Sequence, residues 1–535
     1  MLKRSAPHPI VALSLGLFLA LSLYQLELPG LHYDEALDIL PSIQLLLHKP
    51  LEPFRGAAIY VRTLPLPLMI YDYLGTVNTY LAIPFFALLG IETSSLRLMP
   101  ILLAALTIAS TYLLAAEIFD RETALLASLL LAVHPSFIFW SRQGVYVTSV
   151  LTLLTTSSLL AFLRWRHQKK AGYLYLGCFL SGLGLFAKFS FLWFLAGITV
   201  AGLLLQGLKL AKTVRNRGSF PPTATQGLIA LLFLALGSWP LILFNLQTQG
   251  TIEIIRTYLF TSYLGVDNLA FGVNFAARLD QFSALLRGAQ FWYLGDVLSN
   301  SLYSPLFALV TLGTIPLFTR ERKWGKKSLF LMILMGVMLP LSAFTPTGLK
   351  PAHYVIFLPF PQLLLAASLT LWMRQEPRRL FYSAALLVAI VLLFSDLRVD
   401  IGYHRALSRT GGFDGHTAAV YELASYLEER GEPAVAMDWG IRNNIYFLTR
   451  GEVDPQEIFG FESQKEPDPG FAARLAPHLS DPHTLYIFHS PEETIFNRWE
   501  AFQALAQKRG QVLRVEKAIL DRSGKKIFLL VRVEP

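Results

Sequence analysis

Residues 9–26 read PIVALSLGLFLALSLYQL and contain no charged side chain. Because a helix needs about 20 apolar residues to cross the hydrocarbon of a bilayer, this run predicts a membrane-spanning helix. The run follows Lys3 and Arg4 and lacks a small-residue cleavage site before Glu27, which favours an uncleaved first span over a signal peptide. We therefore expect the N-terminus in the cytoplasm.

Ten further apolar runs follow. They lie near residues 96–117, 122–140, 144–163, 172–187, 189–208, 226–246, 303–319, 328–344, 354–373 and 380–396. The 535 residues are 53% hydrophobic and only 16% charged, which excludes one soluble core of this size. The sequence therefore predicts an α-helical polytopic membrane protein with about 11 transmembrane helices in a lipid bilayer.

Lysine and arginine residues gather in short clusters between the runs, at residues 120–122, 164–170, 209–217, 320–327 and 374–379. With eleven spans, every cluster faces the cytoplasm, as the positive-inside rule requires. This pattern explains the net charge of +9, and nucleic acid is not an expected partner.

The count of eleven depends on the apolar stretch at residues 64–89, which must not cross the membrane. If it crossed, every later basic cluster would face outward. Its Pro65, Pro67 and Pro84 favour interrupted segments, so we expect a pair of juxtamembrane or re-entrant helices there.

This topology predicts two domains. Residues 1–396 form a transmembrane domain with outer loops at 27–95 and 247–302, and residues 397–535 form an extracytoplasmic domain. The second region has ordinary charge density and mixes strand-like runs with amphipathic helical stretches, which predicts a small soluble α/β domain. Strands are expected near 434–439, 484–489, 512–520 and 526–533, and helices near 416–430 and 492–508.

The sequence LHYDEA at residues 31–36 follows the first span directly. Its adjacent carboxylates, Asp34 and Glu35, suit a general base and a group that orients a sugar, an acceptor or a cation. The first turn of a solvated helix explains the same pair without catalysis, because acidic side chains are favoured there.

Cationic residues lie at the predicted outer ends of spans. Arg97 precedes the second span, Arg142 follows the third, Lys188 follows the fifth, and Lys350 with His353 precedes the tenth. An anionic leaving group such as a lipid phosphate needs cations of this kind. Snorkelling to lipid headgroups explains any one of them, but four on the less basic side are harder to explain in that way.

Aromatic residues and metal ligands give weaker signals. The aromatic side chains that suit stacking on sugars or polyprenyl chains, but equally an interfacial belt, are Tyr71, Tyr73, Tyr80, Tyr258, Tyr263, Trp292, Tyr293 and Tyr354. His134 and His353 have no His or Glu partner at ligand spacing, so no metal site is predicted. Cys178 is the single cysteine, which excludes an intramolecular disulfide.

The order of motifs resembles the GT-C membrane glycosyltransferases, specifically family 39 and its bacterial relatives, which include protein O-mannosyltransferases and the aminoarabinose transferase that acts on lipid A. The matching motifs are Asp34-Glu35, Tyr73-Leu74-Gly75 through Tyr80 and Pro84 to Gly90, Leu96-Arg97-Leu98-Met99-Pro100, His134-Pro135 with Ser141-Arg142, Gly182 to Lys188, and Lys350 with His353-Tyr354 leading to Leu358-Pro359. Together they cover roughly residues 5–396. Relatives carry an acid shortly after the position of Arg142, and this chain has none at 143–146.

The resemblance implies transfer of a sugar from a polyprenyl-phosphate donor to a hydroxyl of a protein, lipid or glycan acceptor, with inversion, on the outer face of a prokaryotic plasma membrane. Asp34 is then the base and Glu35 positions the acceptor or the sugar. Arg97, Arg142, Lys188 and Lys350 are the candidates that neutralise the phosphate. The remaining substrate-binding candidates are Tyr33, Tyr73, Tyr80, His353 and Tyr354. The need for a divalent cation is left open.

A transporter or flippase of lipid-linked sugars is the main alternative, and a non-enzymatic membrane scaffold is a third. A transporter also needs many spans, cations and aromatic side chains. The sequence shows no internal repeat and few ionisable residues in mid-span, which counts against ion-coupled transport.

Overall fold

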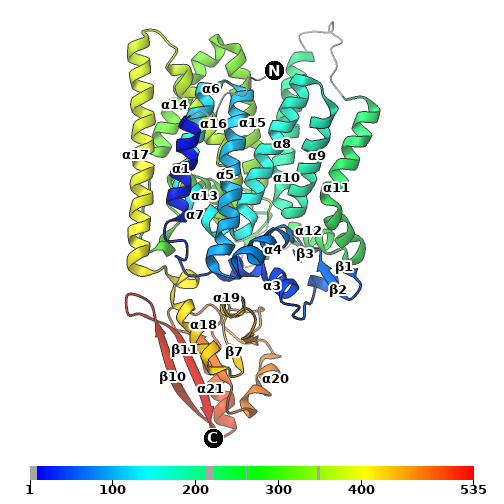
Figure 1. Cartoon of the computed structure of the whole chain (residues 1–535), viewed down its shortest axis with the longest axis vertical. Coiled ribbons are helices and arrows are strands. Elements are labelled where there is room, and N and C mark those ends of the chain that lie inside the picture. The colour runs from blue at the N-terminus through cyan, green and yellow to red at the C-terminus, as the bar shows by residue number, and fades with distance from the viewer. Residues whose placement is uncertain (1–8, 211–221, 261, 264–265, 346–349) are drawn as a thin grey trace.

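The computed structural model describes residues 9–210, 222–260, 262–263, 266–345 and 350–535. They form a bundle of long helices with a smaller domain at one end, next to the segment that follows the first helix (Figure 1). The smaller domain contains the C-terminus, whereas the described N-terminal helix begins near the opposite end of the bundle.

The bundle helices follow the predicted apolar runs. Their bounds are α1 Pro9–Leu23, α5 Thr93–Ile118, α6 Arg121–Ala132, α7 Pro135–Gln143, α8 Thr148–Gln168, α9 Ala171–Ala187, α10 Leu192–Leu210, α11 Ala224–Thr248, α14 Tyr303–Arg320, α15 Arg322–Ser342, α16 Pro359–Trp372 and α17 Arg378–Thr410. Short 3-10 turns precede two of them, η3 Phe189–Phe191 before α10 and η5 Pro351–Phe357 before α16. The prediction of a multi-pass helical membrane protein is confirmed.

Among the described residues, four helices are individually long and apolar enough to cross a membrane: α5, α11, α15 and α17. Two bent pairs raise the number to six, α6 with α7 at 60° and η5 with α16 at 49°. Both bends lie at a proline, Pro135 and Pro359, whose ring is tolerated in the first turn of a new helix but not inside a continuing one. The total of eleven spans stays a prediction.

The two ends of the bundle differ in the loops that they carry. At one end Arg374 binds Asp120 at 2.6 Å and Glu122 at 2.7 Å, so the predicted basic loops around these residues meet. The basic loop at 209–217 lies largely outside the described residues. The other end carries the segment after α1, the segment between α11 and α14, and the C-terminal domain (Figure 1).

The segment after α1 begins with two short helices, α2 Tyr33–Leu37 and α3 Leu40–Leu46. Strands β1 Ala58–Val61 and β2 Leu64–Pro67 then pair antiparallel, followed by β3 Met69–Tyr71, β4 Leu74–Gly75 and helix α4 Val77–Leu89. The prediction of two helices over residues 64–89 was therefore wrong for its first half. Pro65 and Pro67 lie in a two-stranded hairpin with free edges, where a missing N–H is tolerated.

The segment between α11 and α14 contains α12 Gly250–Phe260, strands β5 Ser262–Tyr263 and β6 Val266–Asp267, α13 Phe271–Arg287 and the 3-10 turn η4 Trp292–Leu294. Arg55 connects it to the first loop, because Arg55 binds Asp72 of the same loop at 2.8 Å and Glu253 of α12 at 3.2 Å. The hydroxyl of Thr251 also donates to the carbonyl of Asp72 at 2.5 Å.

The C-terminal domain contains a five-stranded sheet in the order β10-β11-β9-β7-β8. Its elements are η6 Asp414–His416, α18 Ala419–Arg430, β7 Ala434–Ala436, α19 Arg442–Leu448, β8 Gln456–Glu457, α20 Phe471–Leu475, η7 His478–Ser480, β9 Leu485–His489, α21 Trp499–Lys508, β10 Val512–Leu520 and β11 Lys526–Glu534. The four predicted strands and both predicted helices are present. The predicted boundary after residue 396 falls inside α17, which continues to Thr410, so the domain begins later than expected.

The C-terminal domain and the first loop share one hydrophobic core. Leu31, Ala36 and Phe86 pack in the same buried cluster as Leu423 and Phe447. Polar contacts cross the same interface, since the side-chain amide of Asn444 donates to the carbonyl of Leu31 at 3.1 Å. The first loop is thus held between the bundle and the C-terminal domain.

Gly30 tests this interface. A Cβ at residue 30 would lie 1.9 Å from the backbone oxygen of Thr417, so Gly30→Ala forces the two segments apart. We expect it to lower the free energy of unfolding by about 1–3 kcal/mol, measured by thermal unfolding in detergent. Gly16→Ala is the control, because nothing lies within 4 Å of that position and alanine favours helix. Equal stability of the two variants would contradict the close approach.

Candidate active site

The buried centre of the first loop is an ion pair between Arg97 of α5 and Glu35 of α2. Arg97 Nε donates to Glu35 Oε1 at 2.7 Å and Arg97 Nη2 donates to Oε2 at 2.9 Å. Their side chains are 0% and 1% exposed. The guanidinium also donates to the carbonyls of Leu26 and Pro29, both at 2.8 Å. Arg97 therefore fixes both α2 and the chain that leads into it.

This geometry changes the predicted roles of Arg97 and Glu35. The polar atoms of both side chains form hydrogen bonds with each other and with nearby backbone. Neither side chain is therefore presented to a donor phosphate or an acceptor. Arg142 is likewise internal: its Nη2 donates to the carbonyls of Tyr24 at 2.7 Å, Gln25 at 2.6 Å and Leu28 at 3.1 Å. Arg142 therefore holds the segment that follows the first helix, which ends at Leu23.

Asp34 lies beside this ion pair but points elsewhere. His32 caps α2, because its Nδ1 accepts from the backbone N–H of Asp34 at 3.1 Å. Burial lowers the pKa of His32, which keeps the imidazole neutral and its Nδ1 able to accept. The side chain of Asp34 is 22% exposed, in contrast to the nearly inaccessible Glu35. Of the two predicted carboxylates, only Asp34 is accessible to a substrate.

A second carboxylate, Asp38, accompanies Asp34. It lies one helical turn later and is 4% exposed. The side-chain amide of Asn78 in α4 donates to Asp38 Oδ2 at 3.4 Å, and the hydroxyl of Thr79 donates to its carbonyl at 2.6 Å. Burial raises the pKa of the Asp38 carboxyl to about 7, and the charge of Lys188 opposes this rise. We did not predict Asp38 or Asn78, although the i, i+4 spacing of Asp34 and Asp38 indicates a shared helix face.

Lys188 joins the carboxylates from the far end of α9. Both Asp34 and Asp38 lie within electrostatic range of its ammonium group. The backbone holds it there: Leu74 of β4 forms a bridge with Lys188, and the N–H of Phe189 donates to the carbonyl of Tyr73 at 3.0 Å. The Nζ of Lys188 lies 3.2 Å from Nδ1 of His353. Segments far apart in sequence therefore meet at one site.

Lys350 lies next to the same group. It immediately precedes η5, and its charge acts on His32 and His416. The His416 ring stacks on His32 at a centroid distance of 4.1 Å and on Tyr293 at 3.8 Å. Tyr293 in turn donates to the side-chain oxygen of Gln143 at 2.9 Å, so the residue after Arg142 takes part in this cluster. No sequence pattern had indicated a role for His416.

The predicted aromatic residues divide into two groups. Tyr71 and Tyr73 are 36% and 40% exposed and stack at a ring-centroid distance of 6.0 Å, and Tyr71 lies within electrostatic range of Asp34. Tyr33 instead donates to Glu457 of the C-terminal domain at 3.0 Å, and Tyr80 donates to the carbonyl of Pro67 at 2.8 Å.

The other predicted aromatic residues lie elsewhere or outside the described side chains. Tyr354 is fully buried against Trp193 and lies in the packed core. The side chains of Tyr258 and Tyr263 are outside the described part of the structure. Trp292 is 51% exposed and borders a separate cavity.

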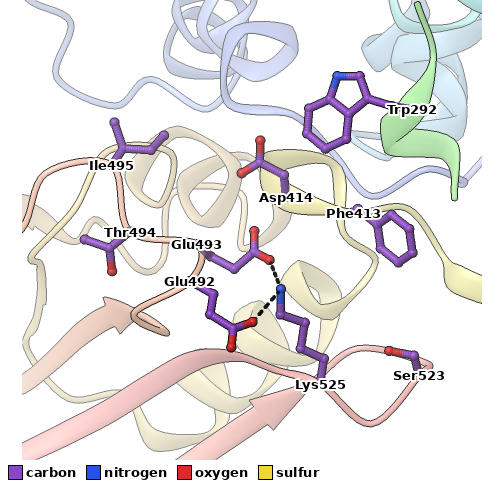
Figure 2. A pocket seen from close by; sticks show the side chains of 9 residues that line it. All are labelled: Trp292, Phe413, Asp414, Glu492, Glu493, Thr494, Ile495, Ser523 and Lys525. Carbon is purple, nitrogen blue, oxygen red and sulfur yellow. Dashed lines mark hydrogen bonds and ion pairs between the residues drawn. The ribbon is translucent and has the colours of Figure 1, made fainter. Parts of the chain in front are cut away.

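A cavity of about 590 Å³ opens between the bundle and the C-terminal domain (Figure 2). Trp292 and Phe413 present their rings to it, and Lys525 crosses to Glu492 at 3.1 Å and Glu493 at 2.6 Å. It adjoins the carboxylate site through η6, because Asp414 borders the cavity and acts electrostatically on His32. Aromatic rings beside carboxylates suit hydroxyl-rich or cationic ligands.

We next asked whether the described side chains cluster in a way that would bind a metal ion. Within the described ranges, no group of three or more His, Cys, Asp or Glu side chains is placed to hold a metal ion. His134 is fully buried in the bundle, where its Nε2 lies 3.2 Å from the carbonyl of Leu286.

Comparison with solved structures defines the class. The chain superposes on ArnT from Cupriavidus metallidurans bound to undecaprenyl phosphate with a TM-score of 0.59 and 12% identity, over 98% of this chain and 97% of that chain. It also resembles the Archaeoglobus fulgidus oligosaccharyltransferase AglB in complex with an inhibitory peptide and a dolichol-phosphate, with a TM-score of 0.50 and 14% identity, over 93% and 70% of the two chains. The chain has the GT-C fold.

The sequence comparison is more specific but shorter. Residues 76–256 match the family model for dolichyl-phosphate-mannose-protein mannosyltransferase. No curated protein sequence matches the chain significantly. The predicted resemblance to GT-C glycosyltransferases related to the aminoarabinose transferase is confirmed.

The Arg97–Glu35 pair has a direct test. We expect Arg97→Leu to lower the free energy of unfolding by about 3–5 kcal/mol, because Glu35 is left as an unpaired buried charge. The double variant Glu35→Leu/Arg97→Leu removes both charges and should recover part of this loss in thermal unfolding. Glu452→Gln, which breaks the exposed pair with Lys49, is the control and should cost less than about 1 kcal/mol. A fully stable Arg97→Leu protein would exclude the structural role.

The raised pKa of Asp38 predicts a pH dependence of stability. In the unfolded chain the carboxyl has a pKa of about 3.9, so the folded state binds its proton more tightly. The resulting stabilisation is complete below the unfolded pKa and is lost as the pH rises through about 7. We expect this carboxyl to lower the melting temperature progressively as the pH rises from about 4 to about 7, with little further change above that, and Asp38→Asn to reduce this slope. The exposed Asp280→Asn should keep the wild-type slope.

Proposed function

We propose that this chain transfers a glycosyl group from a polyprenyl-phosphate-linked donor to an acceptor hydroxyl, with Asp34 as the general base. One observation supports this most: in a GT-C fold, an accessible carboxylate lies with Asp38 and Lys188 at the end of the bundle that carries the C-terminal domain. The solved structures of similar fold that contain undecaprenyl phosphate and dolichol-phosphate agree with a lipid-phosphate donor.

The proposed reaction is a single displacement. Asp34 takes the proton of the acceptor hydroxyl, and the acceptor oxygen forms a bond to the anomeric carbon. The bond between that carbon and the phosphate oxygen breaks, and polyprenyl phosphate leaves with the electron pair. Attack from the face opposite to the leaving phosphate inverts the anomeric configuration. Lys188 and Lys350 stabilise the charge that develops on the phosphate.

The other polar residues take supporting roles in this proposal. Glu35 and Arg97 position α2 and so the Asp34 side chain. Arg142 holds the end of α1. Tyr71 lies within electrostatic range of Asp34 and stacks on Tyr73, so these two exposed rings suit stacking against the sugar or the first isoprene units.

We infer that the reaction takes place on the outer face of a prokaryotic plasma membrane. The basic loops at the opposite end of the bundle support this, because Lys and Arg clusters favour the cytoplasmic side. The N-terminus is then cytoplasmic and the C-terminal domain is extracytoplasmic. The cavity of Figure 2 lies on the same side as Asp34 and suits the approach of an acceptor.

The test is release of polyprenyl phosphate. The purified chain in lipid, supplied with undecaprenyl-phospho-sugars and a mixture of cell-envelope acceptors, is expected to release undecaprenyl phosphate, detected by mass spectrometry. Asp34→Asn should reduce this release by about 10²–10⁴-fold because the hydroxyl is no longer deprotonated.

Asp280→Asn removes an exposed carboxylate outside the site and should retain wild-type release. Unchanged turnover in Asp34→Asn would exclude Asp34 as the base. Movement of the donor between leaflets without any transfer would instead support a flippase.

A further inference from the structure

A second cavity, of about 700 Å³, lies at the end of the bundle opposite to the C-terminal domain. The ends of α5, α8 and α10 and the beginning of α15 surround it. These are the elements that carry two of the basic loops, at residues 164–170 and 320–327. The cavity shares no lining residue with the Asp34 site or with the cavity of Figure 2.

The lining of this cavity is strongly cationic. Five Lys and Arg side chains contribute to it: Arg166, Lys169, Lys323, Lys326 and Lys327. No acidic residue is among its described lining residues. The undescribed segment at 211–221 cannot supply one, because its sequence AKTVRNRGSFP contains neither Asp nor Glu.

The acids on the neighbouring helix ends do not line the cavity, and each is paired with at least one basic side chain outside its lining. Glu117 lies 4.0 Å from Arg164 and also contacts His167. Asp120 and Glu122 both bind Arg374, which is not part of the cavity. Asp120 and Glu117 act on Lys327 from outside the lining, and the described lining itself contains basic side chains and no acidic one, so it carries a net positive charge.

The rest of the lining is apolar. Ile118, Leu163, Leu205 and Phe330 form part of the same wall, on the side toward the bundle interior. A cavity that joins several cations to an apolar wall at a membrane boundary matches a phosphate headgroup with its first acyl methylenes. A soluble anion would use only the cationic half.

We propose that this cavity is a binding site for the phosphate of an anionic membrane lipid. The positive-inside pattern requires basic loops, but it does not require a cavity with an apolar wall. Membrane topology alone therefore does not explain this cavity. A lipid bound there would neutralise the mutual repulsion of the five cations and hold the ends of α8 and α15 together. The site is independent of the reaction proposed at Asp34.

Native mass spectrometry of the full-length chain provides the test. The probes are phosphatidylglycerol, phosphatidylcholine as the zwitterionic comparison, and inorganic phosphate as a competitor. We expect tighter binding of phosphatidylglycerol than of phosphatidylcholine. In Lys323→Gln/Lys326→Gln, the affinity for phosphatidylglycerol should fall by about tenfold or more, because each basic group near the surface contributes to anionic-lipid binding.

The matched control is Arg378→Gln/Arg379→Gln. It removes the same charge from exposed residues that do not line the cavity. We expect its affinity for phosphatidylglycerol to stay within about twofold of wild type. An equal loss in this control would show diffuse surface attraction and overturn the proposal.

Two further outcomes also decide against the proposal. Equal binding of phosphatidylcholine and phosphatidylglycerol would exclude recognition of the anionic group, and displacement by inorganic phosphate at equal concentration would exclude a lipid site. Melting temperatures of both variants without added lipid separate loss of binding from loss of folding. Failure of these tests leaves the glycosyl transfer proposed at Asp34 unaffected.

Discussion

The ion pair between Arg97 and Glu35 is the constraint on which the candidate site depends. Two buried charges are tolerated only when their hydrogen-bonding groups are satisfied, and here the carboxylate, two backbone carbonyls and the guanidinium satisfy one another. The pair ties α2 to α5 and to the chain that leaves α1. Because Asp34 immediately precedes Glu35, the same contacts determine where Asp34 lies. The buried carboxylate of Glu35 thus positions the accessible carboxylate of Asp34.

The C-terminal domain completes this arrangement from the other side. Its helices share a hydrophobic core with α2 and α4, and Glu457 accepts a hydrogen bond from Tyr33, the residue before Asp34. His416 inserts between the rings of His32 and Tyr293, so the linker after α17 also contacts the cap of α2. The domain is therefore a structural part of the site and not an independent appendage. This explains why the short helix α2 can be held rigidly between a membrane bundle and a small sheet.

The sequence predicted the helices and the C-terminal strands well, because apolar runs and strand-like patterns are local signals. The contacts of Arg97 and Arg142 were not predicted, since a cation at the end of a span has the same sequence pattern whether it binds a phosphate, Glu35 or the backbone carbonyls that follow α1. Those partners come from distant residues and require the fold. The position of Asp38 beside Asp34 could have been predicted from the sequence, because a residue four positions later lies on the same helix face. The positions of His416 and Asn78 in the site could not have been predicted, because no nearby residue in the chain indicates their partners.

The two ends of the bundle hold their cations in different ways. Near Asp34, the charge of Lys188 is partly compensated by Asp34 and Asp38, so an arriving phosphate competes with carboxylates for the same ammonium group. In the proposed reaction Lys188 therefore serves both partners. Its ammonium group stabilises the charge on the leaving phosphate and stays within electrostatic range of Asp34, the proposed base.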